Sequence, residues 1–318
     1  MTTLARAASR ETVTPIMNSH LWDDFVPRDG DVVVATYPKC GTTWTQRIVD
    51  LLIFQSPDPR PVMRIAPWLD CVFMAPHEVN LANLEAQTHR RSVKSHLPFD
   101  ALPIYAGVKY IHTARDGRDA CLSMHNHELG IANRISAAAA SGEAPSSSSE
   151  RPQRQIPTDQ REYFLSWIAE AEAGGVKADA GLPFCEFEQT YWVERGRSNL
   201  LMVHYADLKA DLAGEMARIA DFLEIDTPPA VMDQLVDAAR FETMKSQGEA
   251  ILPDIGQFFD NGSQRFLHKG ENGRWLGVLT DEDLARYDAL AAARLSPGLR
   301  AWIHGGRRAA GDPRGSED

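Results

Sequence analysis

Short runs of β-branched and other apolar residues alternate along the chain with longer stretches that carry apolar residues at helical spacing. Residues 31–38 (DVVVATYP) form the first run, and a turn at Gly41 joins it to residues 45–54 (TQRIVDLLIF), which have a helical pattern. Residues 108–113 lead in the same way into a helical pattern that contains Cys121. The pattern therefore predicts a repeated order of strand, loop and helix.

Two further runs extend this alternation. One ends at residues 93–96 (VKSH), and Pro98 prevents it from continuing as a regular central strand. The other covers residues 200–204 and precedes an amphipathic pattern over residues 213–223. Such an order predicts an α/β fold with a central parallel β-sheet flanked by helices. Ligands of these sheets bind beyond the carboxyl ends of the strands, which here carry Lys39 to Thr43, Lys94 to His96, Arg115 and Tyr205.

The length of 318 residues fits one large domain. We expect an N-terminal extension over residues 1–30, the domain over 31–305 and a disordered tail over 306–318. Residues 136–157 are small, polar and proline-containing, with no periodic apolar face, so they are expected to form a flexible loop that could cover the site.

Composition excludes several classes of protein. A formal net charge of −11 argues against a nucleic-acid partner, because binding the phosphate backbone requires clustered positive charge. No run approaches about 18 apolar residues and no signal peptide is visible, so we expect a cytoplasmic protein without a membrane span. The cysteines are far apart and form no CxxC pair, which argues against a zinc site or a disulfide framework; they are Cys40, Cys71, Cys121 and Cys185.

Residues 38–43 (PKCGTT) join the first strand to the first helix. The N-terminus of a helix presents unpaired N–H groups and a positive dipole end, and Lys39 adds charge, so the loop could bind a phosphate or sulfate. A simple turn capped by a threonine is the structural alternative. The lysine precedes the glycine, unlike the GxxxxGK[ST] loop of nucleoside triphosphatases, which argues against a hydrolase or kinase of that type. Cys40 is a candidate nucleophile, but its separation from Arg47 is one residue too long for a tyrosine-phosphatase loop.

Four motifs now resemble one family. TYPKCGTTW (36–44), VKSH (93–96), YIHTARDGRDACLSM (110–124) and HKGENGRW (268–275) are similar, in order and spacing, to the motifs of the cytosolic sulfotransferases, with bacterial, actinobacterial-like members nearest. YADL at 205–208 and FETM at 241–244 are also similar. The resemblance implies a sulfotransferase fold like that of the P-loop nucleotide kinases. It also implies that 3′-phosphoadenosine 5′-phosphosulfate (PAPS) is the sulfuryl donor and 3′,5′-diphosphoadenosine (PAP) the product.

The resemblance assigns residues to the parts of this nucleotide. Lys39 and the N–H groups of Cys40, Gly41, Thr42 and Thr43 would hold the 5′-phosphosulfate. Arg115 and Ser123 would bind the 3′-phosphate. The loop at residues 268–275, called the late loop below, is expected to help through His268, Lys269 and Gly270. The adenine would lie among Trp44, Tyr205, Phe241 and Met244. Without the resemblance, Trp44 would be interpreted as a core residue, and Phe241 and Met244 equally well as core residues or as ligand contacts.

His96 stands at the family's catalytic position. A neutral imidazole there would accept the proton of the acceptor hydroxyl as its oxygen attacks sulfur in line. Lys94 and Lys39 would stabilise charge in the transition state, and no metal is expected. A histidine at a strand end is otherwise an ordinary polar or capping residue.

This sequence departs from the family pattern at several positions. Cys40 replaces the usual serine, which removes a strong hydroxyl donor from the loop. His268 stands where arginine is usual, and Arg274 where aspartate is usual. The animal dimerisation motif is absent around Thr280, so the sequence leaves homo-oligomerisation open.

The acceptor is expected to be a small molecule with a hydroxyl and an apolar or aromatic body. Three regions, 65–90, 128–165 and 245–262, should cover it, and they contain Pro67, Trp68, Phe73, Met74, Phe258 and Phe259. A phenol, an alcohol or a lipid-linked alcohol would fit. Two alternatives stay open: an inactive protein that binds PAP or PAPS, and a P-loop nucleotide kinase.

Overall fold

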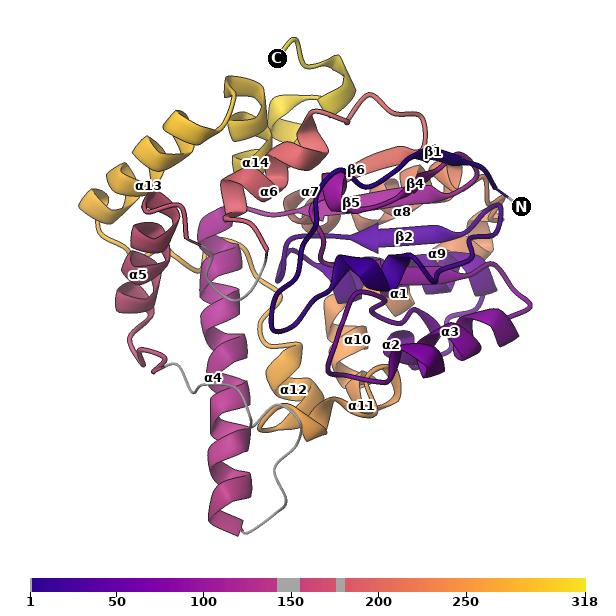
Figure 1. The fold of residues 1–318 in the computed structure, drawn as a ribbon, viewed down its shortest axis with the longest axis horizontal. Coiled ribbons are helices and arrows are strands. Elements are labelled where there is room, and N and C mark those ends of the chain that lie inside the picture. The colour runs from indigo at the N-terminus through magenta and orange to yellow at the C-terminus, as the bar shows by residue number, and fades with distance from the viewer. Residues whose placement is uncertain (1, 142–154, 176–180) are drawn as a thin grey trace.

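A four-stranded parallel sheet with the order β3-β2-β5-β6 lies at the centre of the fold (Figure 1). The computed structural model describes residues 2–141, 155–175 and 181–318. The strands are β2 (Val32–Ala35), β3 (Ser92–Ser95), β5 (Lys109–Ala114) and β6 (Leu200–His204). All pairings are parallel, with Val34 opposite both Lys94 and Ile111. The α/β architecture expected from the alternating pattern is confirmed, and the carboxyl ends of the strands share one edge.

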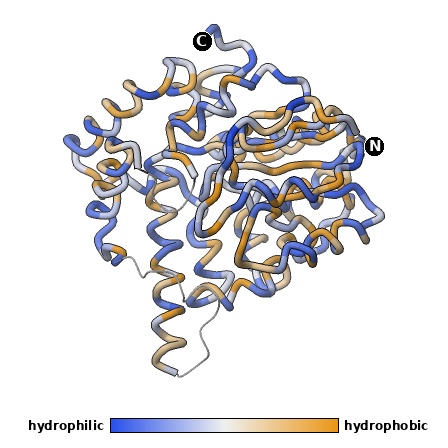
Figure 2. The backbone as a smooth tube through the Cα atoms, in the orientation of Figure 1, coloured by the Kyte–Doolittle hydropathy of each residue, from blue (hydrophilic) through white to orange (hydrophobic). Residues whose placement is uncertain are grey.

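Helices cover both faces of the sheet, and every residue of β2, β3 and β6 is therefore buried. Val33 and Ala35 belong to the apolar core on one face, and Val32 and Val34 to the core on the other. Figure 2 shows hydrophobic residues concentrated along these strands. The first core is closed by α5 (Gln160–Glu172), α6 (Phe184–Trp192), α13 (Asp281–Arg294) and α14 (Pro297–Ala310). The second is closed by α1 (Thr42–Phe54), α8 (Leu212–Phe222) and α9 (Pro229–Ala239).

Short elements complete the described part of the chain. The helices among them are α2 (Val62–Ile65), α3 (His77–Ala86), α7 (Tyr205–Ala210), α10 (Phe241–Ser246), α11 (Gly248–Ile251) and α12 (Gly262–Phe266). The 3₁₀ turns are η1 (Ser19–Trp22), η2 (Phe99–Ala101), η5 (Ile255–Gln257) and η6 (Pro313–Gly315). Strand β1 (Leu4–Arg6) pairs with β4 (Ile104–Tyr105), which ties the N-terminal segment to the domain. No helix of the described residues is long and apolar enough to cross a bilayer.

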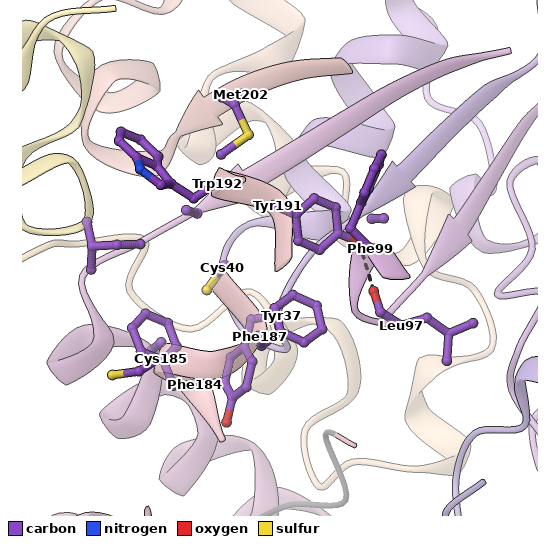
Figure 3. Close-up of a cluster of buried hydrophobic side chains, with 14 of the residues drawn as sticks. Tyr37, Cys40, Leu97, Phe99, Phe184, Cys185, Phe187, Tyr191, Trp192 and Met202 are labelled. Carbon is purple, nitrogen blue, oxygen red and sulfur yellow. Dashed lines mark hydrogen bonds between the residues drawn. The ribbon is translucent and has the colours of Figure 1, made fainter. Parts of the chain in front are cut away.

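An aromatic cluster supports the loop that follows β2. The ring of Tyr37 meets that of Phe184 edge to face at 5.1 Å, and the thiol of Cys40 points into the same cluster (Figure 3). The Tyr191 hydroxyl donates a hydrogen bond to the Leu97 carbonyl oxygen at 2.8 Å, also drawn in Figure 3. The loop therefore stands on closely packed side chains from α6.

A buried polar pair joins the sheet to α6. His112 of β5 lies 3.0 Å from the carbonyl oxygen of Ala35 through Nδ1 and 2.8 Å from a carboxylate oxygen of Glu188 through Nε2. Both side chains are fully buried, and the imidazole stacks on Tyr191 at 3.8 Å. Since each nitrogen faces an acceptor, the arrangement holds a strand to a helix by hydrogen bonds that water does not weaken.

Helix α4 (Gly117–Ser141) is longer than the sequence indicated, and it projects beyond the rest of the domain (Figure 1). The flexible loop predicted over 136–157 is wrong for residues 136–141, which are helical. Alanine is the best helix former, so the alanines at 137–140 extend the helix instead of starting a linker. Residues 142–154 of the predicted loop lie outside the described residues.

The tail predicted over 306–318 is also ordered in part. Helix α14 continues to Ala310, and η6 follows with Pro313 buried. The guanidinium of Arg195 donates hydrogen bonds to the carbonyl oxygens of Pro313 at 2.9 Å and Ser316 at 3.1 Å. These bonds to the backbone hold a segment that has a polar, loop-like composition, and the prediction of disorder is wrong there.

Candidate active site

A cavity of about 600 Å³ opens at the carboxyl edge of the sheet. It is lined by residues that directly follow β2, β5 and β6, and by the end of β3. The structure brings almost all of the predicted site residues to its walls: Lys39, Gly41, Thr42, Thr43, Trp44, Lys94, His96, Arg115, Ser123, Tyr205, Phe241, Met244, His268, Lys269 and Gly270. Parallel topology explains the convergence, because the strands end together.

The loop before α1 is shaped by Gly41. This residue has φ of 105°, a left-handed conformation, and a β-carbon there would lie 2.9 Å from the ring of Tyr205. Gly41 is the N-cap of α1 and no side chain caps the helix. The first N–H groups of a 13-residue helix are thus left for a ligand at the positive end of its dipole. The Thr42 hydroxyl is hydrogen-bonded to that of Thr36 at 2.6 Å.

Lys39 extends from this loop into the cavity. Its ammonium lies 3.1 Å from Nδ1 of His127, on α4, and 4.6 Å from the ring centre of Phe266. Burial, together with the positive charges of Lys94 and Arg115, lowers the pKa of Lys39 to about 7. Burial and the charge of Lys39 lower the pKa of His127 well below its usual range, so the neutral imidazole accepts a hydrogen bond from the ammonium.

His96 is buried at the end of β3, with one nitrogen committed to the backbone. Its Nδ1 lies 2.8 Å from the carbonyl oxygen of Thr36, which can only accept a hydrogen bond. Burial, the charge of Lys94 and that of Lys39 lower the pKa of His96 well below its usual range. The neutral ring therefore carries its proton on Nδ1 and its lone pair on Nε2.

Lys94 is positioned by an indole. Its ammonium lies 4.2 Å from the ring centre of Trp68, which also meets the ring of His96 edge to face at 4.8 Å. The buried carboxylate of Asp70 accepts a hydrogen bond from the Trp68 indole at 2.7 Å and from the backbone N–H of His96 at 3.3 Å. Burial lowers the pKa of Lys94 to about 8. Asp70, which the sequence analysis missed, thus orients both catalytic candidates on β3.

The aromatic residues predicted around an adenine lie together. Trp44 meets Tyr205 edge to face at 5.2 Å, and its indole N–H donates to the carbonyl oxygen of Ala239 at 2.7 Å. Gly270 has φ of 64°, and a β-carbon on it would lie 2.4 Å from the ring of Phe241. Only glycine lets the late loop approach Phe241 this closely.

Cys40 is the exception among the predicted contacts. Its side chain is fully buried in the cluster of Figure 3 and does not line the cavity, and its N–H group donates to the carbonyl oxygen of Tyr37 at 3.3 Å. Burial raises the pKa of this thiol well above its usual range. Its thiol is therefore not placed to act as a nucleophile, and a ligand contact of Cys40 through its backbone stays a prediction.

Much of the remaining cavity wall is apolar. Each of the three regions predicted to cover an acceptor contributes, through Trp68, Phe73, Met74, Ile131, Ile135, Ile156, Ile255, Phe258 and Phe259. Pro67 does not line the cavity, whereas Ile16 of the N-terminal segment does. Helix α4 supplies a stripe with four-residue spacing: Ser123, His127, Ile131 and Ile135. This spacing is the signal in the sequence that could have identified His127.

A family model described as the sulfotransferase domain matches residues 29–297 of the chain. The chain belongs to the sulfotransferase family. It is 34% identical over 310 residues to a glycolipid sulfotransferase of Mycobacterium bovis, with 90% of this chain and 91% of the relative covered.

Two solved structures share the fold of this sulfotransferase. Mouse sulfotransferase SULT7A1 complexed with PAP has a TM-score of 0.63 at 18% identity and covers 89% of this chain and 91% of its own. Retinol dehydratase in a complex with retinol and PAP has a TM-score of 0.66 at 22% identity, covering 87% and 84%.

Proposed function

We propose that this sulfotransferase uses PAPS as its donor and transfers the sulfuryl group to the hydroxyl of an apolar small molecule. The observation that carries the proposal is the geometry of His96, whose Nδ1–H donates to the Thr36 carbonyl oxygen and leaves the basic Nε2 on a side chain that lines the cavity. Lys39 and Lys94 line the same cavity. A base and two lysines in one cavity suit sulfuryl transfer, which needs a proton acceptor and positive charge beside the leaving oxygen.

The residues present fit this donor. The N–H groups at the start of α1 suit the 5′-phosphosulfate, and the aromatic rings of Trp44, Tyr205 and Phe241 suit an adenine. Arg115, buried at the end of β5, suits the 3′-phosphate, since a planar guanidinium binds phosphate oxygens in pairs. Mouse SULT7A1 and retinol dehydratase were both solved with PAP, which supports this choice of donor.

In the reaction, the acceptor oxygen forms a bond to sulfur while the bond from sulfur to the bridging phosphate oxygen breaks, and PAP leaves. His96 Nε2 takes the proton of the acceptor hydroxyl. Lys39 donates a hydrogen bond to the bridging oxygen as negative charge develops there. Lys94 is held by Trp68 beside the imidazole, and burial together with the charge of Lys94 lowers the pKa of His96, which keeps the ring neutral before the reaction.

The acceptor is an alcohol or phenol with an apolar body, and a lipid-linked alcohol fits best. The stripe on α4 passes from Ser123 to Ile135, about 18 Å along the helix axis at 1.5 Å per residue. Its outer half is apolar and faces a wall with Phe73, Phe258 and Phe259. The similarity to a glycolipid sulfotransferase supports an acceptor with an extended apolar part.

The experiment is a sulfuryl-transfer assay with PAPS and a panel of phenols, short alcohols and long-chain alcohols. His96→Ala should lower kcat by about 100-fold or more, as expected for loss of a general base, while PAP affinity changes less than about threefold. His20→Ala is the matched control, since this exposed histidine is bonded to Glu11 and does not line the cavity. It should leave both quantities unchanged.

Two results would contradict the proposal. Tight binding of PAP without transfer to any acceptor would favour a nucleotide-binding protein. Retention of kcat in His96→Ala would remove the imidazole from the mechanism.

A further inference from the structure

Two arginines, Arg115 and Arg274, line the cavity. Arg115 is 5% exposed, and its guanidinium lies 4.2 Å from the ring centre of Tyr205 and donates a hydrogen bond to the carbonyl oxygen of Glu271. Its Nε is buried with no hydrogen-bond partner among the described residues. Arg274 belongs to the same loop as Glu271, and burial, followed by the charge of Arg115, lowers the pKa of Arg274.

Arg274 is fixed to the start of α4 through its backbone. The buried carboxylate of Asp119 accepts hydrogen bonds from the N–H group of Gly273 at 2.8 Å and from that of Arg274 at 2.9 Å. The side chain is thus carried by a loop that is tied to the same helix as Ser123. The hydrogen bonds to Asp119 therefore fix the backbone of Arg274 at the cavity wall.

The two guanidinium groups have no carboxylate partner of their own. In the described residues no carboxylate oxygen lies within 4.0 Å of either group. Asp119 and Glu271 favour the charged form of Arg274 only from a greater distance. Two like charges held together at a partly buried site repel one another, and an anion with two charges and several oxygens would relieve this repulsion.

We propose that Arg274 binds the phosphate on the donor's 3′ position together with Arg115. The proposal rests on the proposed donor and adds a ligand to its site. A phosphate between the two guanidinium groups would accept hydrogen bonds from both, each in a planar fork geometry.

The neighbouring residues explain why a second arginine is needed here. Burial and the charges of Arg274 and Lys269 lower the pKa of His268 to about 4, so this imidazole carries no charge at neutral pH. The ammonium of Lys245 is hydrogen-bonded to the His268 carbonyl oxygen at 2.6 Å. His268 thus supplies no charge and Lys245 does not line the cavity, whereas Arg274 lines it together with Lys269.

The test is calorimetric titration of the full chain with PAP and with AMP, which lacks the 3′-phosphate. Arg274→Gln should weaken PAP binding by about 10- to 100-fold, as expected for loss of charge-assisted hydrogen bonds, and change AMP binding less than about twofold. Arg118→Gln is the matched control. Arg118 is adjacent to this loop, 4.0 Å from the ring centre of Trp275, but it pairs with Asp116 and does not line the cavity.

The outcomes separate this inference from the proposed function. If Arg274→Gln lowered the affinity for PAP and for AMP equally, the loop would be damaged and the inference overturned. Unchanged PAP affinity in this variant would also overturn it. A loss confined to PAP, with Arg118→Gln like the wild type, supports it. Wild-type protein that binds PAP and AMP equally would overturn the donor assignment itself, and Arg274 would then have no 3′-phosphate to read.

Discussion

The pKa of Lys39 leads to a strong pH dependence of nucleotide binding. In the ligand-free protein this pKa is lowered to about 7. The 5′-phosphate of PAP, bound beside Lys39, would raise it again, because an opposite charge nearby favours the ammonium. Binding therefore takes up a proton, and affinity is greatest below pH 7 and falls as the pH rises above it.

The size of the effect follows from the pKa. The fraction of free protein with a charged Lys39 falls from about one half at pH 7 to about one hundredth at pH 9, so the Kd for PAP should rise by up to about 50-fold through Lys39. The pKa of Lys94 is lowered to about 8, so loss of its charge between pH 7 and 9 raises the Kd for PAP by a further factor of at most about ten. At pH 8 Lys39 alone accounts for uptake of about 0.9 proton.

Titration calorimetry with PAP at pH 7, 8 and 9, in two buffers of different ionisation enthalpy, measures both the Kd and the proton uptake. The Lys39→Met variant should bind PAP weakly at pH 7, and its Kd should rise no more than the tenfold that Lys94 allows between pH 7 and 9. Lys109→Met is the control, because this lysine pairs with Glu224 at the opposite end of β5. A wild-type Kd that changes less than about fivefold, or equal slopes for wild type and Lys39→Met, would refute the reasoning.

Three further substitutions test the surroundings of the site. Cys40→Ser should retain activity but lower the free energy of unfolding by about 1–3 kcal/mol in urea titrations, since its hydroxyl is buried among apolar side chains; loss of transfer without loss of stability would contradict the buried position. Gly270→Ala should abolish PAP binding by calorimetry, because its methyl group overlaps the ring of Phe241, and tight binding would show that the loop can shift. His112→Ala should cost about 3–5 kcal/mol, measured by urea unfolding, because it leaves the carboxylate of Glu188 buried and unpaired; a cost under 1 kcal/mol would argue against the pair.

Strand-end residues could be predicted from the sequence, and loop geometry could not. His96, Arg115 and Tyr205 directly follow strands β3, β5 and β6, and parallel topology places such positions on one edge of the sheet. The orientation of Cys40 depends on Lys39, whose φ of 70° is left-handed and turns the next side chain into the core. No pattern of hydrophobic residues encodes that angle.

Contacts between segments that are far apart in the sequence could not be predicted either. Lys39 and His127 are 88 positions apart, and their hydrogen bond depends on how α4 crosses the site. Residues 136–141 were misassigned because alanine occurs both in linkers and in helices, and only the packing of α4 decides between them.

The stripe on α4 has a consequence for how this enzyme can diversify. One helix carries Ser123 at the proposed nucleotide site and Ile131 and Ile135 at the apolar end of the cavity, with about one turn between successive positions of the stripe. A change of side-chain volume at Ile135 or Ile131 alters the room for an acceptor in increments of one turn, while the first turns of the helix stay in place. Single substitutions at these positions can therefore admit new acceptors, while the residues of the proposed nucleotide site stay unchanged.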